Sequence, residues 1–298
     1  MGKVQKMDGP VPEGLVITPG GLRPKSNVHF IEPGHHLSGK DGVFRKIHTA
    51  SGEVVKEFGA INKGNKNRKI LRKRRRPIKS ARGLIGAPQP ITDQWIIYSG
   101  WMNNSGTPIN SFATKWAVPN PPASQDNQLI YLFNGLENAA SNVILQPVLQ
   151  WGVSPIGGGN YWAIANWYVG APSSGLAFHG PLVEVAPGVN LGGIMTLTAQ
   201  NGGLFNYNSA FIGYAADLPV TDVDELVWAV ETLECYGLQQ FSDYPNSPST
   251  AMGGIEIKVG GNEAAIQWTP YNAVTDNGQH CTIVSDDSPN GEVDLCYT

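Results

Sequence analysis

Two glutamines stand out in the strand-like stretch "ILQPVLQWG" at 144–152. Because successive side chains of a strand point to opposite faces, Gln146 and Gln150 share one face. The stretch "ELVWAVETL" at 225–233 places Glu231 on a mixed face in the same way. Amides and carboxylates among small and aromatic residues are typical of a binding groove, where a few polar groups orient a ligand.

The elements that must position these side chains are short strands. From about residue 92, apolar runs alternate with turn signals such as "PNPP" and "IGGGN", without helical periodicity. An earlier hairpin is expected in "GVFRKIHTASGEVVKEFG", with "ASGE" as its turn. The pattern predicts an antiparallel sandwich or barrel. The expected strands are 94–101, 110–118, 128–134, 143–151, 161–169, 181–186, 192–199, 203–213, 225–233, 252–259, 264–268 and 281–285.

The charge is divided along the chain. Residues 1–90 carry a net charge of +13, whereas residues 91–298 carry −16 and contain only two basic residues, Lys115 and Lys258. Such a division is typical of a basic tail or prosegment beside an acidic body. We therefore expect a prosegment-like region at 1–60, a basic linker at 61–90 and a β-sandwich domain at 91–298.

The basic run at 63–82 contains eleven Lys and Arg residues. Four interpretations are open: nucleic-acid binding, a nuclear address, a linker that lies on the acidic body and is cut at "RKRRR" (72–76), or a solvated spacer. An acidic body repels phosphate, so we expect no nucleic-acid partner. We expect no membrane partner either, because no apolar run approaches the roughly 18 residues of a membrane span.

The cysteines suggest no metal site. Cys235, Cys281 and Cys296 have no CxxC spacing, which leaves one disulfide, such as Cys281–Cys296, or three free thiols. The C-terminal "SDDSPNGEVD" at 285–294 departs from the EF-hand pattern and favours an acidic turn. We expect no metal, no cofactor and a monomer.

Several motifs together resemble those of the eqolisin-type glutamic peptidases. In order they are a strand ending in Val-Pro at Pro119, then "FNGLEN", "ILQ", "YWAIANWY" and "VWAVE". The resemblance covers roughly residues 95–235. Glu137 stands where the family has Asp, while Asn166 and Val227 each replace a Glu. These departures leave a relative with altered or lost activity as an alternative.

The resemblance implies two packed, curved antiparallel sheets, a concanavalin-like jelly roll, with the active groove on the concave face. It implies an acid-acting endopeptidase made with a basic prosegment. In that family's chemistry Glu231 would be the general base that activates water, and the Gln146 amide would stabilise the oxyanion. Both should then point into one groove. The expected supporting and substrate-binding residues are Trp101, Phe133, Glu137, Gln150, Asn166 and Trp167.

The implied partner is a polypeptide substrate, with the basic N-terminal segment lying on the acidic body. Secretion is also implied, although residues 1–14 show no apolar core of a signal peptide, so an intracellular protein is the alternative. A second reading of the groove is a carbohydrate-binding sandwich or a glycoside hydrolase, because aromatic residues and amides suit sugars equally well.

Overall fold

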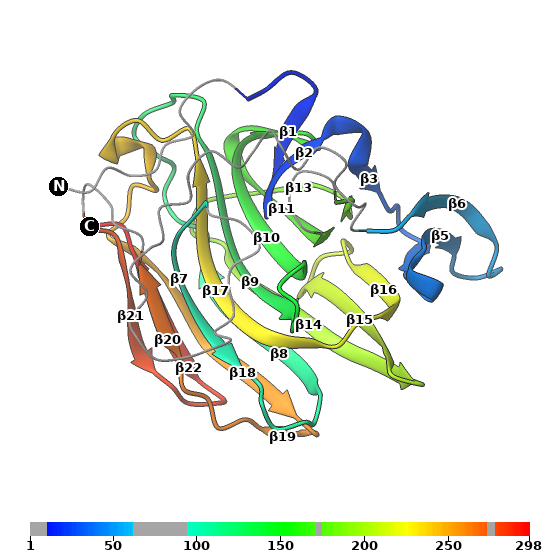
Figure 1. Ribbon diagram of the computed structural model, residues 1–298. Coiled ribbons are helices and arrows are strands. Elements are labelled where there is room, and N and C mark those ends of the chain that lie inside the picture. The colour runs from blue at the N-terminus through cyan, green and yellow to red at the C-terminus, as the bar shows by residue number, and fades with distance from the viewer. Residues whose placement is uncertain (1–10, 62–93, 171–174, 273–277) are drawn as a thin grey trace.

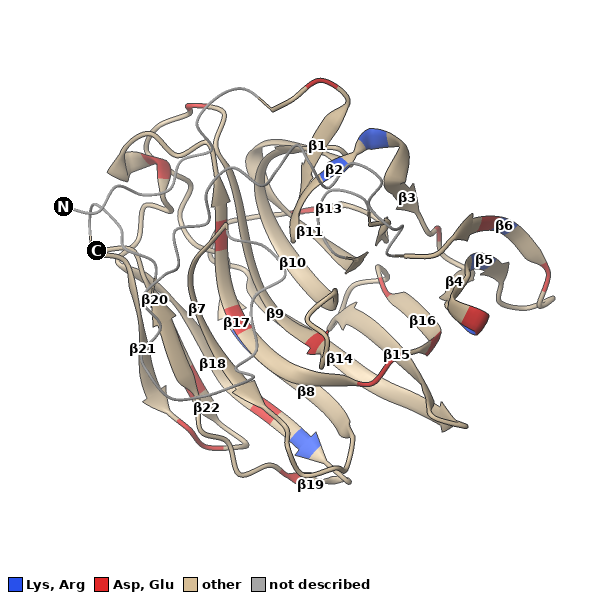
Figure 2. Cartoon of the chain, viewed as in Figure 1, with Lys and Arg blue, Asp and Glu red and all other residues tan. Residues whose placement is uncertain are grey.

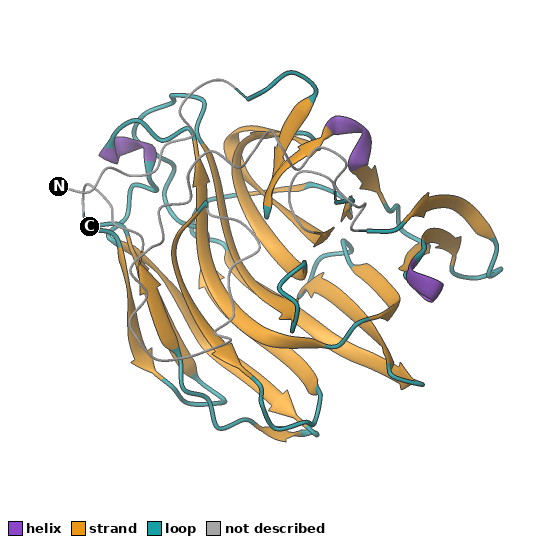
Figure 3. Cartoon of the chain, viewed as in Figure 1, coloured by secondary structure: helices purple, strands orange, loops and turns teal. Residues whose placement is uncertain are grey.

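Two β-sheets packed face to face form most of the molecule (Figure 1). The computed structural model describes residues 11–61, 94–170, 175–272 and 278–298. The basic run at 63–82 and its "RKRRR" lie outside these residues. Within these described ranges, helices are confined to three short 3-10 turns at Lys25–Asn27, Lys40–Gly42 and Phe241–Asp243 (Figure 3). The predicted all-β, two-sheet sandwich is confirmed.

The first sheet has nine strands in the part of the chain that the structure describes. Neighbours pair antiparallel, except for the last pair, β12 and β3, which runs parallel. The order is β20 (Thr269–Asn272), β7 (Trp95–Met102), β17 (Leu226–Tyr236), β9 (Leu129–Asn138), β10 (Val143–Ser154), β11 (Gly157–Gly170), β12 (Ala177–His179) and β3 (Val28–Phe30), with β13 (Val183–Val185) beside β11.

Among the described residues, the second sheet has eleven strands and one parallel pair, β16 with β4. The order is β21 (His280–Ser285), β22 (Gly291–Cys296), β18 (Ser249–Val259), β8 (Ile109–Ala117), β14 (Asn190–Asn201), β15 (Leu204–Phe211), β16 (Leu218–Val223), β4 (His35–Ser38), β5 (Phe44–His48) and β6 (Val54–Gly59), with β19 (Asn262–Glu263) beside β18.

The N-terminal strands belong to both sheets. β3 extends the first sheet and β4–β6 extend the second, so residues 28–59 bridge the two edges (Figure 1). β5 and β6 form the expected hairpin. Upstream, β1 (Leu15–Thr18) and β2 (Gly21–Pro24) form a separate two-stranded hairpin, called here the N-terminal hairpin.

The core lies between the sheets, and a second apolar cluster lies on the first sheet alone. Inner-face residues such as Phe112, Leu145 and Leu149 are fully buried in the inter-sheet core. The second cluster contains Phe133, Trp167 and other residues that point away from the second sheet. We call this second side of the first sheet the outer face.

Several sequence-based expectations need correction. Residues 264–268 form no strand; they cross from the second sheet to the first and bury Ile266 and Trp268 in the core. The acidic turn expected at 285–294 ends early, because β22 begins at Gly291. Several strands, among them β12, β16, β20 and β22, were not predicted. The three cysteines are free, so the disulfide alternative is absent.

Charge is distributed unevenly over the described strands. Figure 2 shows basic residues mainly around β2–β6, whereas acidic residues are spread over both sheets. The described residues include no helix whose length and hydrophobicity suit a membrane crossing.

Candidate functional site on the outer face of the first sheet

Strand register places Gln146 and Glu231 on opposite faces of the first sheet. Val148 lies opposite Phe133, so Gln146, two residues from Val148, shares the face of Phe133. Glu231 lies opposite Asn134, the next residue along β9. Directly opposed residues share a face, whereas consecutive residues do not. Gln146 is therefore on the outer face and Glu231 on the inner face.

The contacts of Glu231 agree with this placement. Its side chain is fully buried between the sheets, and the Thr114 hydroxyl on β8 donates to Oε1 at 2.5 Å. Burial raises the pKa of Glu231 well above its ordinary value. The expectation that Glu231 and Gln146 point into one groove is wrong, because the body of the sheet separates them.

Two further predicted site residues also belong to the inner face. The Asn166 amide donates to the Ala216 carbonyl, and the Ser209 hydroxyl donates to Asn166 Oδ1 at 2.7 Å. Asn166 thus links the two sheets. Trp101 lies opposite Ala229 and packs against the inter-sheet core. The structure does not bring either residue to Gln146.

The other predicted residues do share the outer face with Gln146. Phe133 and Trp167 are buried in the outer cluster, and Glu137 lies opposite Ile144 on the same side. Gln150 is also on this face, but its Nε2 donates to the carbonyls of Gly152 at 2.8 Å and Gly157 at 3.0 Å. Gln150 therefore stabilises the end of β10 rather than facing an open site.

The N-terminal hairpin lies against part of this outer face, beside β10 (Figure 1). Ile17 packs against the outer cluster, and the Tyr131 hydroxyl donates to the Ile17 carbonyl at 3.5 Å. Thr18 and Gly21 are paired, so Pro19 and Gly20 form the two-residue tip. Gly20 has a φ of 97°, which favours glycine over any other residue at that position.

The peptide group between Pro19 and Gly20 forms hydrogen bonds to the sheet through both its oxygen and its nitrogen. Gln146 Nε2 donates to the Pro19 carbonyl oxygen at 3.2 Å. The N–H of Gly20, which belongs to the same peptide group, donates to both carboxylate oxygens of Glu234 at 3.0 Å. An amide and a carboxylate from different strands therefore bracket the Pro19–Gly20 bond.

Glu234 is a residue that the sequence analysis did not select. It lies opposite Tyr131 on β9 and hence on the outer face. The Tyr236 hydroxyl donates to its Oε1, and burial raises the pKa of Glu234 to about 7. The signal was present in the alternation, because Glu234 lies an even number of residues from Trp228 and an odd number from Glu231.

Arg23 anchors the hairpin to the sheet. Its guanidinium is fully buried and donates to the Gly170 carbonyl, and to the carbonyls of Gly20 at 3.1 Å and Gly21 at 2.9 Å. Burial lowers the pKa of Arg23 to about 10, so it stays charged at neutral pH. A buried guanidinium with several acceptors resists removal from its site.

No family model and no curated protein matches the chain. Solved structures do. Two of them are structures of scytalido-glutamic peptidase with a transition-state analogue, each with a TM-score of 0.45. The first is 12% identical over 66% of this chain and 96% of its own chain. The second is 11% identical over 69% of this chain and 99% of its own chain. SCP-B, described as a member of the eqolisin family of peptidases, in complex with the tripeptide Ala-Ile-His, has a TM-score of 0.43 and 12% identity over 67% of this chain and 98% of its own. The likeness is one of fold, and it is distant.

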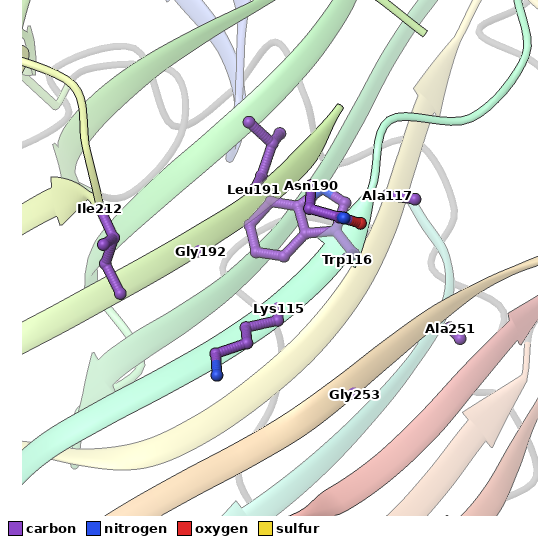
Figure 4. Close-up of a pocket in the computed structure, with 9 residues that line it drawn as sticks. All are labelled: Lys115, Trp116, Ala117, Asn190, Leu191, Gly192, Ile212, Ala251 and Gly253. Atoms are coloured by element: carbon purple, nitrogen blue, oxygen red, sulfur yellow. The ribbon is translucent and has the colours of Figure 1, made fainter. Parts of the chain in front are cut away.

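A separate hollow of about 550 Å³ lies on the second sheet, away from the residues described above. Lys115 stands there between Gly192 and Gly253, which are its direct neighbours on β14 and β18 (Figure 4). None of the predicted site residues lines this hollow. Among the described residues, no cluster of three His, Cys, Asp or Glu side chains is placed to hold a metal ion.

Proposed function

We propose that the outer face of the first sheet is the polypeptide-binding site of a glutamic-type peptidase, and that the N-terminal hairpin occupies it in a precursor form. The observation that carries this proposal is the hydrogen bond from Gln146 Nε2 to the Pro19 carbonyl oxygen. A backbone carbonyl of this chain lies where the carbonyl of a bound substrate would lie.

The chemistry of Gln146 suits that role. Its amide is neutral, buried and supplied by a regular strand, so it donates in a fixed direction. A fixed donor aimed at a carbonyl oxygen stabilises the negative charge that develops there during hydrolysis, and one such donor contributes about 3 kcal/mol. The "ILQ" motif, which resembles that of the glutamic peptidases, independently selects the same residue.

The occupant favours polypeptide over glycan as the ligand. Backbone groups of the hairpin, rather than hydroxyl-bearing side chains, make the bonds to Gln146 and Glu234. Such a site binds the peptide group itself, which is common to all polypeptides. In the occupied form a substrate cannot enter, so hydrolysis requires that the hairpin leave.

The test opens the site in the full-length chain with Gly20→Pro. Proline cannot adopt the positive φ of Gly20 and lacks the N–H that binds Glu234. Gly52→Pro is the matched control, because Gly52 also has a positive φ and a donating N–H but lies in the β5–β6 turn. Cleavage of a denatured protein would be followed from pH 2 to pH 8.

We expect Gly20→Pro to cleave the denatured protein faster than the wild type and Gly52→Pro. Adding Gln146→Ala to Gly20→Pro should lower kcat by about 10²-fold or more. Undiminished cleavage in that double variant would remove Gln146 from the mechanism. Binding of oligosaccharides without any cleavage would favour the carbohydrate-binding alternative.

A further inference from the structure

We propose that Glu234 is the carboxylate that transfers protons in the hydrolysis assigned above to the outer face; this inference rests on that proposed function. Glu231, the carboxylate selected from the sequence, cannot act there because it lies on the inner face. The hairpin shows which carboxylate takes its place. Both oxygens of Glu234 lie 3.0 Å from the Gly20 nitrogen.

The bracketed peptide group identifies the two ends of a bond to be cleaved. Its carbonyl oxygen accepts a hydrogen bond from Gln146, and its N–H donates a hydrogen bond to Glu234. In peptide hydrolysis negative charge develops on that oxygen, and that nitrogen must receive a proton. The amide donor and the carboxylate therefore stand at the atoms where each is needed.

Other carboxylates are less suited to the role. Glu231 faces the second sheet and binds the Thr114 hydroxyl. Glu137 shares the outer face, but it is Gln146 and Glu234 that form hydrogen bonds with the Pro19–Gly20 peptide group. Glu137 is therefore the natural competitor to test against Glu234.

The reaction balances with Glu234 as base and then acid. With a substrate in place of the hairpin, the Glu234 carboxylate takes a proton from water as the water oxygen bonds to the carbonyl carbon. The resulting oxyanion is held by the Gln146 amide. When the C–N bond breaks, Glu234 returns its proton to the leaving nitrogen, which yields a carboxylic acid and an amine and restores the carboxylate.

The same contacts oppose cleavage of the hairpin itself. Gly20 N–H bonds to both oxygens of Glu234, and the Tyr236 hydroxyl donates to Oε1, so the carboxylate is fully engaged. The bond also lies at the tip of a tight two-residue turn rather than in an extended segment. Both features disfavour attack by water on this peptide bond.

The experiment uses full-length Gly20→Pro as the parent and adds Glu234→Gln, Glu231→Gln or Glu137→Gln. Glu231→Gln is the matched control, since it makes the same change on the same strand but on the inner face. Peptide hydrolysis would be measured as kcat and KM across pH, with near-ultraviolet circular dichroism to verify folding. Glu234→Asp, which keeps a carboxylate, serves if Glu234→Gln does not fold.

We expect Glu234→Gln to lower kcat by about 10²-fold or more with KM changed less than about threefold, which is the size of general acid–base effects. Glu231→Gln should retain the parent activity, and Glu234→Asp should keep a reduced activity with a shifted acidic limb. Retained activity in Glu234→Gln, or a loss confined to Glu137→Gln, would overturn the assignment while leaving the peptidase proposal intact. An inactive Gly20→Pro parent would overturn both.

Discussion

Glu231 and Glu234 are close neighbours on β17, yet their carboxyl groups lie on opposite faces of the first sheet. Glu231 binds the Thr114 hydroxyl between the sheets, and Glu234 binds the Gly20 N–H under the N-terminal hairpin. An odd separation along a strand is sufficient to produce this division. It decides which of the two carboxylates can meet a peptide.

The first prediction concerns the hydrogen bond between Gln146 and the N-terminal hairpin. Gln146→Leu removes the donor to the Pro19 carbonyl, and an ordinary hydrogen bond contributes about 0.5–1.5 kcal/mol. Hairpin opening should become roughly 2- to 10-fold more frequent. Hydrogen exchange of the Gly20 amide, which is bonded to Glu234, measures that opening directly.

Gln150→Leu is the control for this variant. Gln150 lies on the same strand and face, but its amide bonds to the carbonyls of Gly152 and Gly157 near the β10–β11 turn, away from the hairpin tip. It should leave Gly20 exchange unchanged. Equal acceleration by both substitutions would show that Gln146 acts through the sheet as a whole.

The second prediction concerns pH and Glu231. Burial raises its pKa in the folded state, so its contribution to stability is fully present below the unfolded value near 4.5 and is lost as the pH rises through the folded value. Glu231→Gln is neutral at every pH. The variant should therefore be more stable relative to wild type at pH 8 than at pH 4.5.

Thermal unfolding of both proteins at the two pH values measures this difference. Because Glu234 is present in both proteins, its own raised pKa cancels in the comparison. A variant that loses the same stability at both pH values would indicate that Glu231 is ionised and satisfied in the folded state.

The third prediction compares two adjacent glycines on β14, one on each face of the second sheet. A Cβ at Gly193 would stand 2.6 Å from Asn134 Oδ1 and 2.8 Å from Pro147 Cγ, both in the packed interior. Gly193→Ala should destabilise the protein by about 1–3 kcal/mol. Chemical denaturation measures that loss.

Gly192→Ala is the matched substitution on the opposite side of the strand. Its Cβ would meet the Ile212 side chain at 3.1 Å, and Ile212 is 57% exposed and free to move. The loss of stability should be clearly smaller than for Gly193→Ala. The reverse order would contradict the assignment of faces in the second sheet.

The fourth prediction concerns the attachment of β3. His179 on β12 lies between Phe30 and Trp167, with ring centroids 5.4 Å and 5.2 Å away, and burial lowers its pKa. A lowered pKa means that the stability from neutral His179 is present above about pH 6.5 and is lost as the pH falls. β3 should therefore be protected less well in acid.

His179→Phe keeps an aromatic ring but removes the titration. Exchange protection of the Ile31 amide, which bonds to the residue 179 carbonyl, should fall between pH 7 and pH 4.5 in wild type and much less in the variant. The same fall in both proteins would mean that other groups control β3 in acid.

The sequence alone determined most of the strands after residue 92 and the residues within each strand that share a face. Alternation grouped Gln146 with Gln150 and separated both from Leu145, because the side-chain period of a strand is two. Turn residues placed most boundaries, and the scarcity of basic residues after residue 90 predicted the acidic body.

Only the tertiary structure decided which face of each strand is turned inward. Both faces of β17 carry apolar residues, Ala229 and Leu233 on one face and Trp228 and Val230 on the other. Hydrophobicity alone therefore could not tell which face packs against the second sheet. The contact from Gly20 to Glu234 joins residues 214 positions apart, a separation that no local pattern encodes. Packing against a second sheet and a distant hairpin, both set by the whole chain, places the carboxylate at the peptide.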